Sequence, residues 1–218
     1  MEISFVGHAC FRLRGRDASV VIDPYGKGIG LQTLVPSRFS ADVLAITHDH
    51  PGHNNRGMVG GDPKVIDSPG EYEVKGVSIQ GVRAFHDEEG GARLGRVTMF
   101  AITIDEVVVA HLGDLGHGLS EAQQDQLGSV DVLLLPVGGG NSLSATAAAA
   151  VANQLEAKVV IPMHYKLPGL KVELDEPGHF AAEMGIENVE YQPKLSINSK
   201  LSGDDMKVIF LEARAAST

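Results

Sequence analysis

Short apolar runs separated by turns dominate residues 1–110 of the chain. Glycine, proline or charged residues stand between the runs, which are rich in valine, isoleucine and phenylalanine. Runs of this length and composition favour strands over helices. The predicted strands cover residues 3–6, 11–14, 19–22, 43–46, 64–66, 77–85, 98–104 and 107–110.

Beyond residue 110 the pattern changes to helical segments that alternate with strands. Ser120 can cap a helix, and Gln123 lies three residues later, where it completes a capping box. An alanine-rich stretch also favours a helix. The predicted helices cover 120–127, 146–155 and 177–184, and the predicted strands 132–135, 159–161 and 207–211. A strand-rich part followed by helix–strand units predicts two packed sheets with helices on the outside.

Length and composition fit one folded domain. The chain has 218 residues, of which 43% are hydrophobic and 21% charged, so it can bury a core. We therefore expect a single domain over residues 1–218. No apolar run approaches the ~20 residues of a membrane span, and the N-terminus does not resemble a signal peptide. The lone Cys10 allows no intramolecular disulfide. These features predict a cytoplasmic protein without a membrane partner.

The charge balance narrows the class of partner. Lys and Arg total 18 against 28 Asp and Glu, which gives a net charge of -10. An acidic surface repels phosphate backbones, so nucleic-acid binding is not expected. We expect a small-molecule substrate. A small anion is compatible with this charge, because metal ions can supply positive charge locally.

Histidines gather at the ends of the predicted strands. The segment T-H-D-H-P-G-H at residues 47–53 directly follows the apolar run 43–46. His86, His111 and His164 also lie at or near the ends of apolar runs. Neutral imidazole is a common metal ligand, and α/β folds place their sites at strand ends. The pattern therefore predicts a metal site.

The order of these residues resembles the metallo-β-lactamase superfamily of metal-dependent hydrolases. The signature of that family is T-H-x-H-x-D-H, followed by a histidine, an aspartate and a histidine at later strand ends. Shorter matches are G-H-A-C-F at 7–11, I-D-P at 22–24, H-L-G-D at 111–114 and P-M-H-Y at 162–165. The first of these is similar to the first hairpin of the lactonase-like and phosphodiesterase-like branches. The resemblance implies the α/β class and an αββα sandwich, with the site at one edge.

The resemblance also implies a site for one or two zinc ions, with manganese as an alternative. The ligands that it implies are His48, His50 and His86 for a first ion, His53 and His164 for a second, and Asp114 between the two. The chain departs from the signature at Gly52, where the family has an aspartate that ligates the second metal. Glycine offers no ligand, so we predict that the second site binds metal more weakly or takes water in the vacant position.

Four other residues each have two interpretations. His8, which together with Asp114 is a candidate catalytic residue, either bonds a substrate or a metal-bound water, or is a packed structural histidine. Asp23 either orients the histidine loop or forms a turn. His111 either supports the residues around Asp114 or replaces His86 as the third ligand. For Cys10, a small buried side chain is favoured over a nucleophile or a metal ligand.

The function implied by the resemblance is hydrolysis of a small ester, lactone or phosphodiester by a metal-bound hydroxide. The alternative is a metal-binding or ligand-sensing protein of the same fold with little catalysis, since Gly52 departs from the signature. A nuclease of the same superfamily is disfavoured by the net charge of -10.

Overall fold

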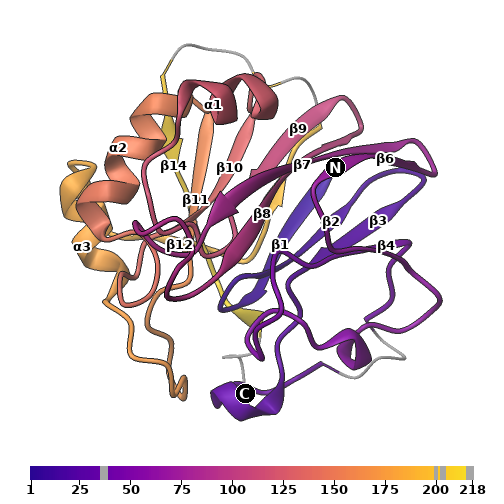
Figure 1. Ribbon diagram of the computed structural model, residues 1–218, viewed down its shortest axis with the longest axis horizontal. Helices are drawn as coiled ribbons and strands as arrows, with labels where there is room; N and C mark the ends of the chain where they lie inside the picture. Colours follow the sequence, from indigo (N-terminus) through magenta and orange to yellow (C-terminus); the bar gives the residue numbers. More distant parts are fainter. Residues whose placement is uncertain (35–38, 199–200, 202–204, 215–218) are drawn as a thin grey trace.

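Two sheets face each other in the computed structural model, which describes residues 1–34, 39–198, 201 and 205–214 (Figure 1). The first sheet has the strand order β13-β1-β2-β3-β4-β5. Its strands are β1 (Glu2–Gly7), β2 (Cys10–Arg14), β3 (Ser19–Ile22), β4 (Val43–Ala45), β5 (Lys64–Ile66) and β13 (Leu195–Ser196). The pairings β3–β4 and β4–β5 are parallel, whereas β1–β2 and β2–β3 are antiparallel.

The second sheet has the order β14-β11-β10-β9-β8-β7-β6. Its strands are β6 (Gly70–Val74), β7 (Val77–Phe85), β8 (Arg96–Ile104), β9 (Val107–His111), β10 (Val132–Pro136), β11 (Val159–Met163) and β14 (Lys207–Val208). Strands β9, β10, β11 and β14 run parallel, and β6 to β9 form an antiparallel meander. A small parallel pair joins β12 (Tyr191–Gln192) to β15 (Phe210–Leu211).

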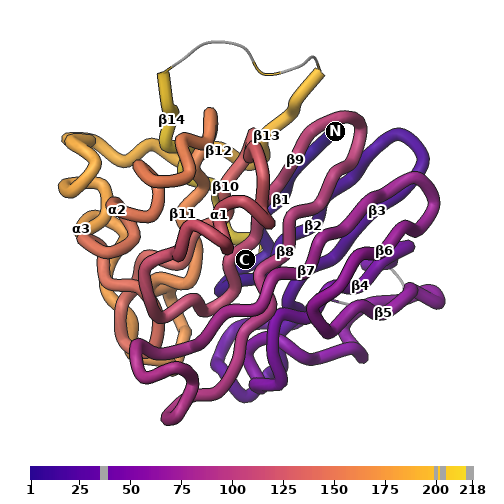
Figure 2. The backbone as a smooth tube through the Cα atoms, turned by 45° about the horizontal axis from the view of Figure 1, so that its top comes forward, coloured from indigo at the N-terminus to yellow at the C-terminus, as the bar shows by residue number. Residues whose placement is uncertain are grey.

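In the described residues, α-helices lie beside the second sheet, and Figure 2 shows them from another direction, opposite the indigo and violet strands of the first sheet. They are α1 (Glu121–Leu127), α2 (Ala145–Leu155) and α3 (Pro177–Glu183), of which α1 contacts β7 and α2 contacts β10. None of the helices in the described part of the chain is both long and apolar enough to traverse a bilayer.

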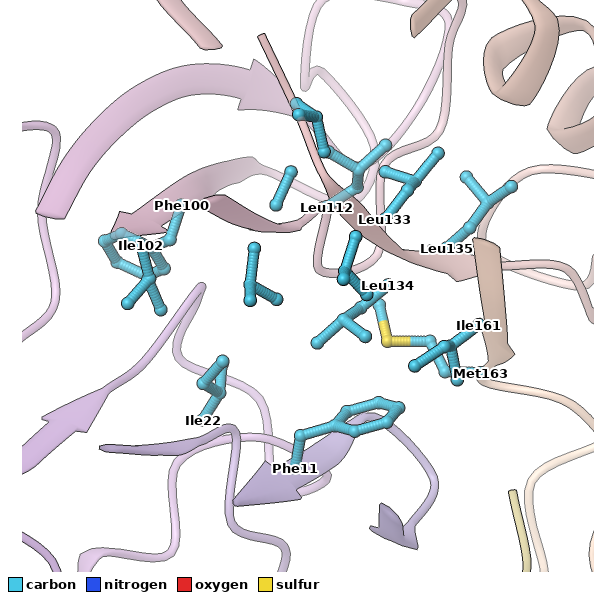
Figure 3. Close-up of a cluster of buried hydrophobic side chains, with 14 of the residues drawn as sticks. Phe11, Ile22, Phe100, Ile102, Leu112, Leu133, Leu134, Leu135, Ile161 and Met163 are labelled. Carbon is cyan, nitrogen blue, oxygen red and sulfur yellow. The ribbon is translucent and has the colours of Figure 1, made fainter. Parts of the chain in front are cut away.

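The main core fills the space between the sheets. Figure 3 shows Phe11 and Ile22 of the first sheet facing Phe100 and Leu134 of the second, and all four are fully buried. Strand β10, V-L-L-L-P, is buried along its whole length because parallel strands flank it and α2 covers it. Burying one such side chain contributes about 1.5–3 kcal/mol, and Leu134→Ala would cost about 2–5 kcal/mol.

The outer face of the first sheet is covered by loops and two short 3-10 helices in the described residues. The helices are η1 (Lys27–Ile29) and η3 (Arg56–Met58). They place Ile29 and Met58 against Val21 and Leu44 in a second hydrophobic cluster. This side of the sandwich therefore has a thinner outer layer than the side that carries α1 to α3.

The predicted elements are found, but one predicted strand is split and three strands were not predicted. The capping box of Ser120 and Gln123 is confirmed at the start of α1. The predicted strand 207–211 is two strands, because β14 pairs with β11 and β15 with β12. Strands β6, β12 and β13 were not predicted. Their exposed or half-buried residues give no apolar run, since each lies at a sheet edge or in a two-strand pair.

The fold brings several strand ends to one edge of the sandwich. Strands β1, β3 and β4 of the first sheet and β7, β9 and β11 of the second each end shortly before a buried histidine or aspartate. These residues are His8, Asp23, His48, His86, Asp114 and His164. The site is therefore built from both sheets at the carboxyl ends of their strands, as in other α/β folds.

Candidate metal centre

Asp114 lies at the centre of the histidine cluster. Its Oδ2 is 3.1 Å from His53 Nε2 and 3.1 Å from His164 Nε2. The same oxygen is 3.3 Å from His86 Nε2 and 3.7 Å from His48 Nε2. With an exposed fraction of 1%, the carboxylate is withdrawn from solvent. One carboxylate oxygen thus faces four imidazoles.

The histidines form two groups of three around this carboxylate. His48, His50 and His86, which we call the open triad, have ring nitrogens within 4.8 Å of one another. His8, His53 and His164, which we call the buried triad, meet the same criterion. His50 is half-buried, whereas the exposed fractions of the buried triad are only 1–2%. The structure therefore brings every predicted ligand together and adds His8.

The donor atoms of these triads fit a metal ion. Several buried atoms have no hydrogen-bond partner among the described residues, namely His8 Nδ1, His48 Nε2, both ring nitrogens of His86 and Asp114 Oδ1. Leaving a buried polar atom without a partner costs about 1–3 kcal/mol. Imidazole nitrogens with a carboxylate oxygen are a donor set that zinc accepts. A divalent cation at each triad would give a partner to one ring nitrogen of each of these histidines and to the carboxylate.

Asp23 and Thr47 hold two of the histidines in place. Asp23 Oδ2 accepts hydrogen bonds from His53 Nδ1 at 2.8 Å and from Thr47 Oγ1 at 2.6 Å. Because the Thr47 hydroxyl donates to Asp23, it accepts from His48 Nδ1, which lies 2.9 Å away. Both rings then carry their proton on Nδ1 and present Nε2 to Asp114. The sequence did not point to Thr47 for this role.

His111 lies outside both triads. It is fully buried, its Nε2 donates to the Ala9 carbonyl at 2.8 Å, and its Nδ1 accepts from the Gly113 N–H at 3.1 Å. Both ring nitrogens are thus used by the backbone. The structure places His86, and not His111, with His48 and His50.

Glycine is required inside the H-L-G-D motif. Gly113 has a φ of +56°, and a β-carbon there would lie 2.9 Å from Thr47 Oγ1 and 2.8 Å from Val97 Cγ1. A side chain would therefore strain the backbone and displace the threonine that orients His48. This glycine lets the turn after β9 deliver Asp114 close to the histidine loop.

The ionisable groups around Asp114 strongly affect one another's pKa values. Burial lowers the pKa of His48 to about 3, which keeps this imidazole neutral. Burial opposes a charge on His53 as well, but Asp114 and Asp23 raise its pKa to about 10. Burial also opposes ionisation of Asp114, yet His164 and His53 hold its pKa well below the ordinary value. The cluster is thus arranged to hold positive charge against two carboxylates, and a cation can supply that charge in place of a proton.

A cavity of about 310 Å³ adjoins the open triad at His86. Asp87 organises one wall, because its carboxylate accepts hydrogen bonds from the backbone N–H groups of residues 89, 91, 93 and 94. The lining also contains Asn141 and Ser142, and Ser142 Oγ lies 3.3 Å from His164 Nδ1. Sequence reasoning missed all three residues. Only the glycines beside them, 90–91 and 138–140, marked these loops.

Comparison with known proteins identifies the family and the fold. The beta-lactamase superfamily domain matches residues 2–164. A metal-dependent hydrolase from Methanoculleus marisnigri is 31% identical over 200 residues, covering 81% of this chain and 86% of the relative. One from Thermococcus onnurineus is 28% identical over 190 residues, covering 76% and 84%. A solved structure from Thermotoga maritima, assigned to the Zn-dependent hydrolases of the metallo-beta-lactamase superfamily, has a TM-score of 0.77 and 35% identity and covers 96% and 97%.

The match to the superfamily domain runs from β1 to His164 and so includes all the residues around Asp114. The family and fold expected from the sequence are confirmed. The hydrolase names of the relatives agree with the hydrolase prediction and not with the ligand-sensing alternative. This chain therefore belongs to the beta-lactamase superfamily and is a metal-dependent hydrolase of the metallo-β-lactamase fold.

Proposed function

We propose that the protein uses zinc to hydrolyse a small ester, lactone or phosphodiester. The observation that carries this proposal is the position of Asp114 Oδ2, within 3.7 Å of ring nitrogens from both triads. The donor set supports zinc, since it combines imidazole nitrogens with one shared carboxylate. The relative from Thermotoga maritima is itself assigned as Zn-dependent. Manganese is the alternative metal.

Each residue of the site has a role that follows from its position. His48, His50 and His86 would hold one ion, His53 and His164 a second, and Asp114 would contact both. Bound ions would act as Lewis acids and lower the pKa of water, which supplies the nucleophile for a carbonyl or phosphorus centre. Asp23 and Thr47 keep the ring nitrogens of His53 and His48 turned inward.

Cys10 does not suit the role of nucleophile. Its side chain is fully buried and lies in the cluster on the outer face of the first sheet. Burial raises the pKa of the thiol well above its ordinary value, so the thiolate is disfavoured. Attack by water supplied at the metal centre is the chemistry that the site supports.

The cavity beside His86 favours a small, neutral substrate. Its lining includes three acidic residues, Asp87, Glu88 and Glu89, against one basic residue, Arg93. The Arg93 guanidinium also lies 3.7 Å from the Glu89 carboxylate. This balance repels anions, so among the three substrate classes we favour an ester or lactone over a phosphodiester.

The test is turnover of a panel of lactones, esters and phosphodiesters by protein of measured metal content. We expect hydrolysis of at least one ester or lactone, a rate that rises with pH and then levels off, loss of the rate on chelation, and recovery with zinc or manganese. His179→Ala is the matched control, because His179 is exposed and lies on α3. Fully metal-loaded protein that turns over none of the panel would contradict the proposal.

A further inference from the structure

We propose that His8 takes the place of the missing aspartate at position 52 and is a ligand of the second metal ion. The inference rests on the proposed two-ion site. A β-carbon built at position 52 would lie 2.8 Å from His8 Nε2 and 3.1 Å from His8 Cδ2, whereas the next neighbour, Ile29 Cγ2, is 3.9 Å away. The imidazole of His8 thus fills the volume that a side chain at position 52 would enter.

The His8 ring faces the other histidines of the buried triad. Its centroid is 4.3 Å from that of His164 and 5.0 Å from that of His53. Its ring nitrogens belong to the group that can share one ion with His53 and His164. The residue is 2% exposed, and its Nδ1 has no hydrogen-bond partner among the described residues. A packed structural histidine would be expected to satisfy that atom, whereas a metal ligand need not do so through protein groups.

The backbone fixes this position at some cost in conformational energy. His8 and His164 both have left-handed φ values, +57° and +52°, and the His164 N–H donates to the His8 carbonyl at 2.7 Å. Such conformations are unfavourable for residues other than glycine and are found mainly at functional sites. The hairpin between β1 and β2 therefore presents His8 to the end of β11 in a defined orientation.

With His8 as a ligand in place of an aspartate at position 52, the two halves of the site become alike. With His8 included, the second ion is offered three imidazoles and Asp114, as the first is by the open triad and Asp114. A second site built in this way has the nitrogen-rich donors that zinc prefers over manganese. We therefore expect two sites of comparable affinity, and not the weaker second site that Gly52 alone predicts.

The proposal is tested by measuring the metal content of variants at positions 8 and 52. Apo protein is titrated with zinc, and bound metal per chain is measured after dialysis, for the wild type, His8→Gly, Gly52→Asp and the double variant. Glycine is chosen at position 8 because it tolerates the positive φ. We expect two ions in the wild type and one in His8→Gly, with at least a tenfold loss of affinity for the second. Gly52→Asp alone should also weaken the second ion, since its side chain collides with His8.

The double variant gives the decisive result. With the His8 imidazole removed, a carboxylate introduced at position 52 has room to act as a ligand, so His8→Gly combined with Gly52→Asp should recover the second ion. His179→Ala is the control and should bind two ions. Circular dichroism confirms that each variant is folded, and Gly52→Ala, which changes no ligand, should weaken the second ion by crowding His8.

Three results would overturn the proposal. They are a His8→Gly protein that keeps both ions at wild-type affinity, a folded double variant that fails to recover the second ion, and a wild type that binds only one ion. Metal counts do not depend on turnover, so failure to find a substrate would affect the proposed function alone.

Discussion

The two triads on either side of Asp114 differ in how firmly the protein holds them. In the buried triad, His53 is fixed by Asp23 at 2.8 Å, His164 lies 3.3 Å from Ser142 Oγ, and the backbone of His8 is bonded to that of His164. Solvent scarcely reaches any of its three side chains. This side of the site is positioned in advance.

The open triad has fewer supports, although Thr47 holds His48. His86 makes no ring hydrogen bond with the described residues, and His50 is partly exposed. The cavity with the acidic wall adjoins His86. Ligands that are bonded to other protein groups keep their orientation, whereas less constrained ones can adjust to a substrate. One half of the centre thus supplies a fixed geometry, and the other supplies access.

Removing the carboxylate common to both sides should have the largest effect. Asp114→Asn should lose metal from both triads and lower kcat/KM by about 10³-fold or more, because an amide carries no charge to bind the ions. Metal content and kinetics measure the two effects. Asp125→Asn, at an exposed position on α1, is the control. Retention of two ions by Asp114→Asn would show that the carboxylate is not the shared ligand.

The supports of the buried triad can be removed without changing a ligand. Asp23→Asn should lower metal affinity by about 10–100-fold, because His53 loses its charged partner and Thr47 loses its acceptor. The loss should be larger for one of the two binding events in a zinc titration, because His53 loses a direct partner whereas His48 is affected only through Thr47. Asp67→Asn removes an exposed carboxylate that pairs with Arg56 and serves as the control. Equal weakening of both events would mean that Asp23 does not act mainly on the buried triad.

The open triad is tested by comparing two neighbouring histidines. His86→Ala should lose one ion. His111→Ala should keep both ions but lower the free energy of unfolding by about 1–3 kcal/mol, because the Ala9 carbonyl loses its partner. Metal analysis and denaturant unfolding separate the two outcomes. If His111→Ala loses metal while His86→Ala keeps it, the assignment of the third ligand is wrong.

The smallest effect on activity is expected away from both triads. Cys10→Ser should change the rate by less than about twofold, although a hydroxyl in the apolar cluster without a partner would cost about 1–3 kcal/mol of stability. Steady-state kinetics and thermal unfolding of the same preparation provide the check. An inactive but folded and metal-loaded Cys10→Ser protein would place the thiol in the mechanism.

Much of the fold and of the candidate site can be predicted from the sequence, because apolar runs and the histidines after them are local features. The buried strand β10 and the capped helix α1 can be identified from a few adjacent residues. The split between β14 and β15 cannot, since the residues around Ile209 pair with two different strands.

The environment of His8 was also beyond sequence reasoning. Its contact with position 52 joins residues that are far apart in the chain and depends on a left-handed backbone. The loop held by Asp87 could not be predicted either, because its structure requires four backbone N–H groups to turn toward one carboxylate.

The residues of the site come from six separate strand ends, and this has a consequence for the order in which the site forms during synthesis. Domains form as the chain emerges at about 5–20 residues per second, but His164 follows β11, which comes late in the sequence. Until β11 has been synthesised and inserted beside β10, the buried triad does not exist. Loading of the proposed second ion would therefore be a late step that joins the N-terminal hairpin to β11, and a nascent chain halted before β11 would lack His164.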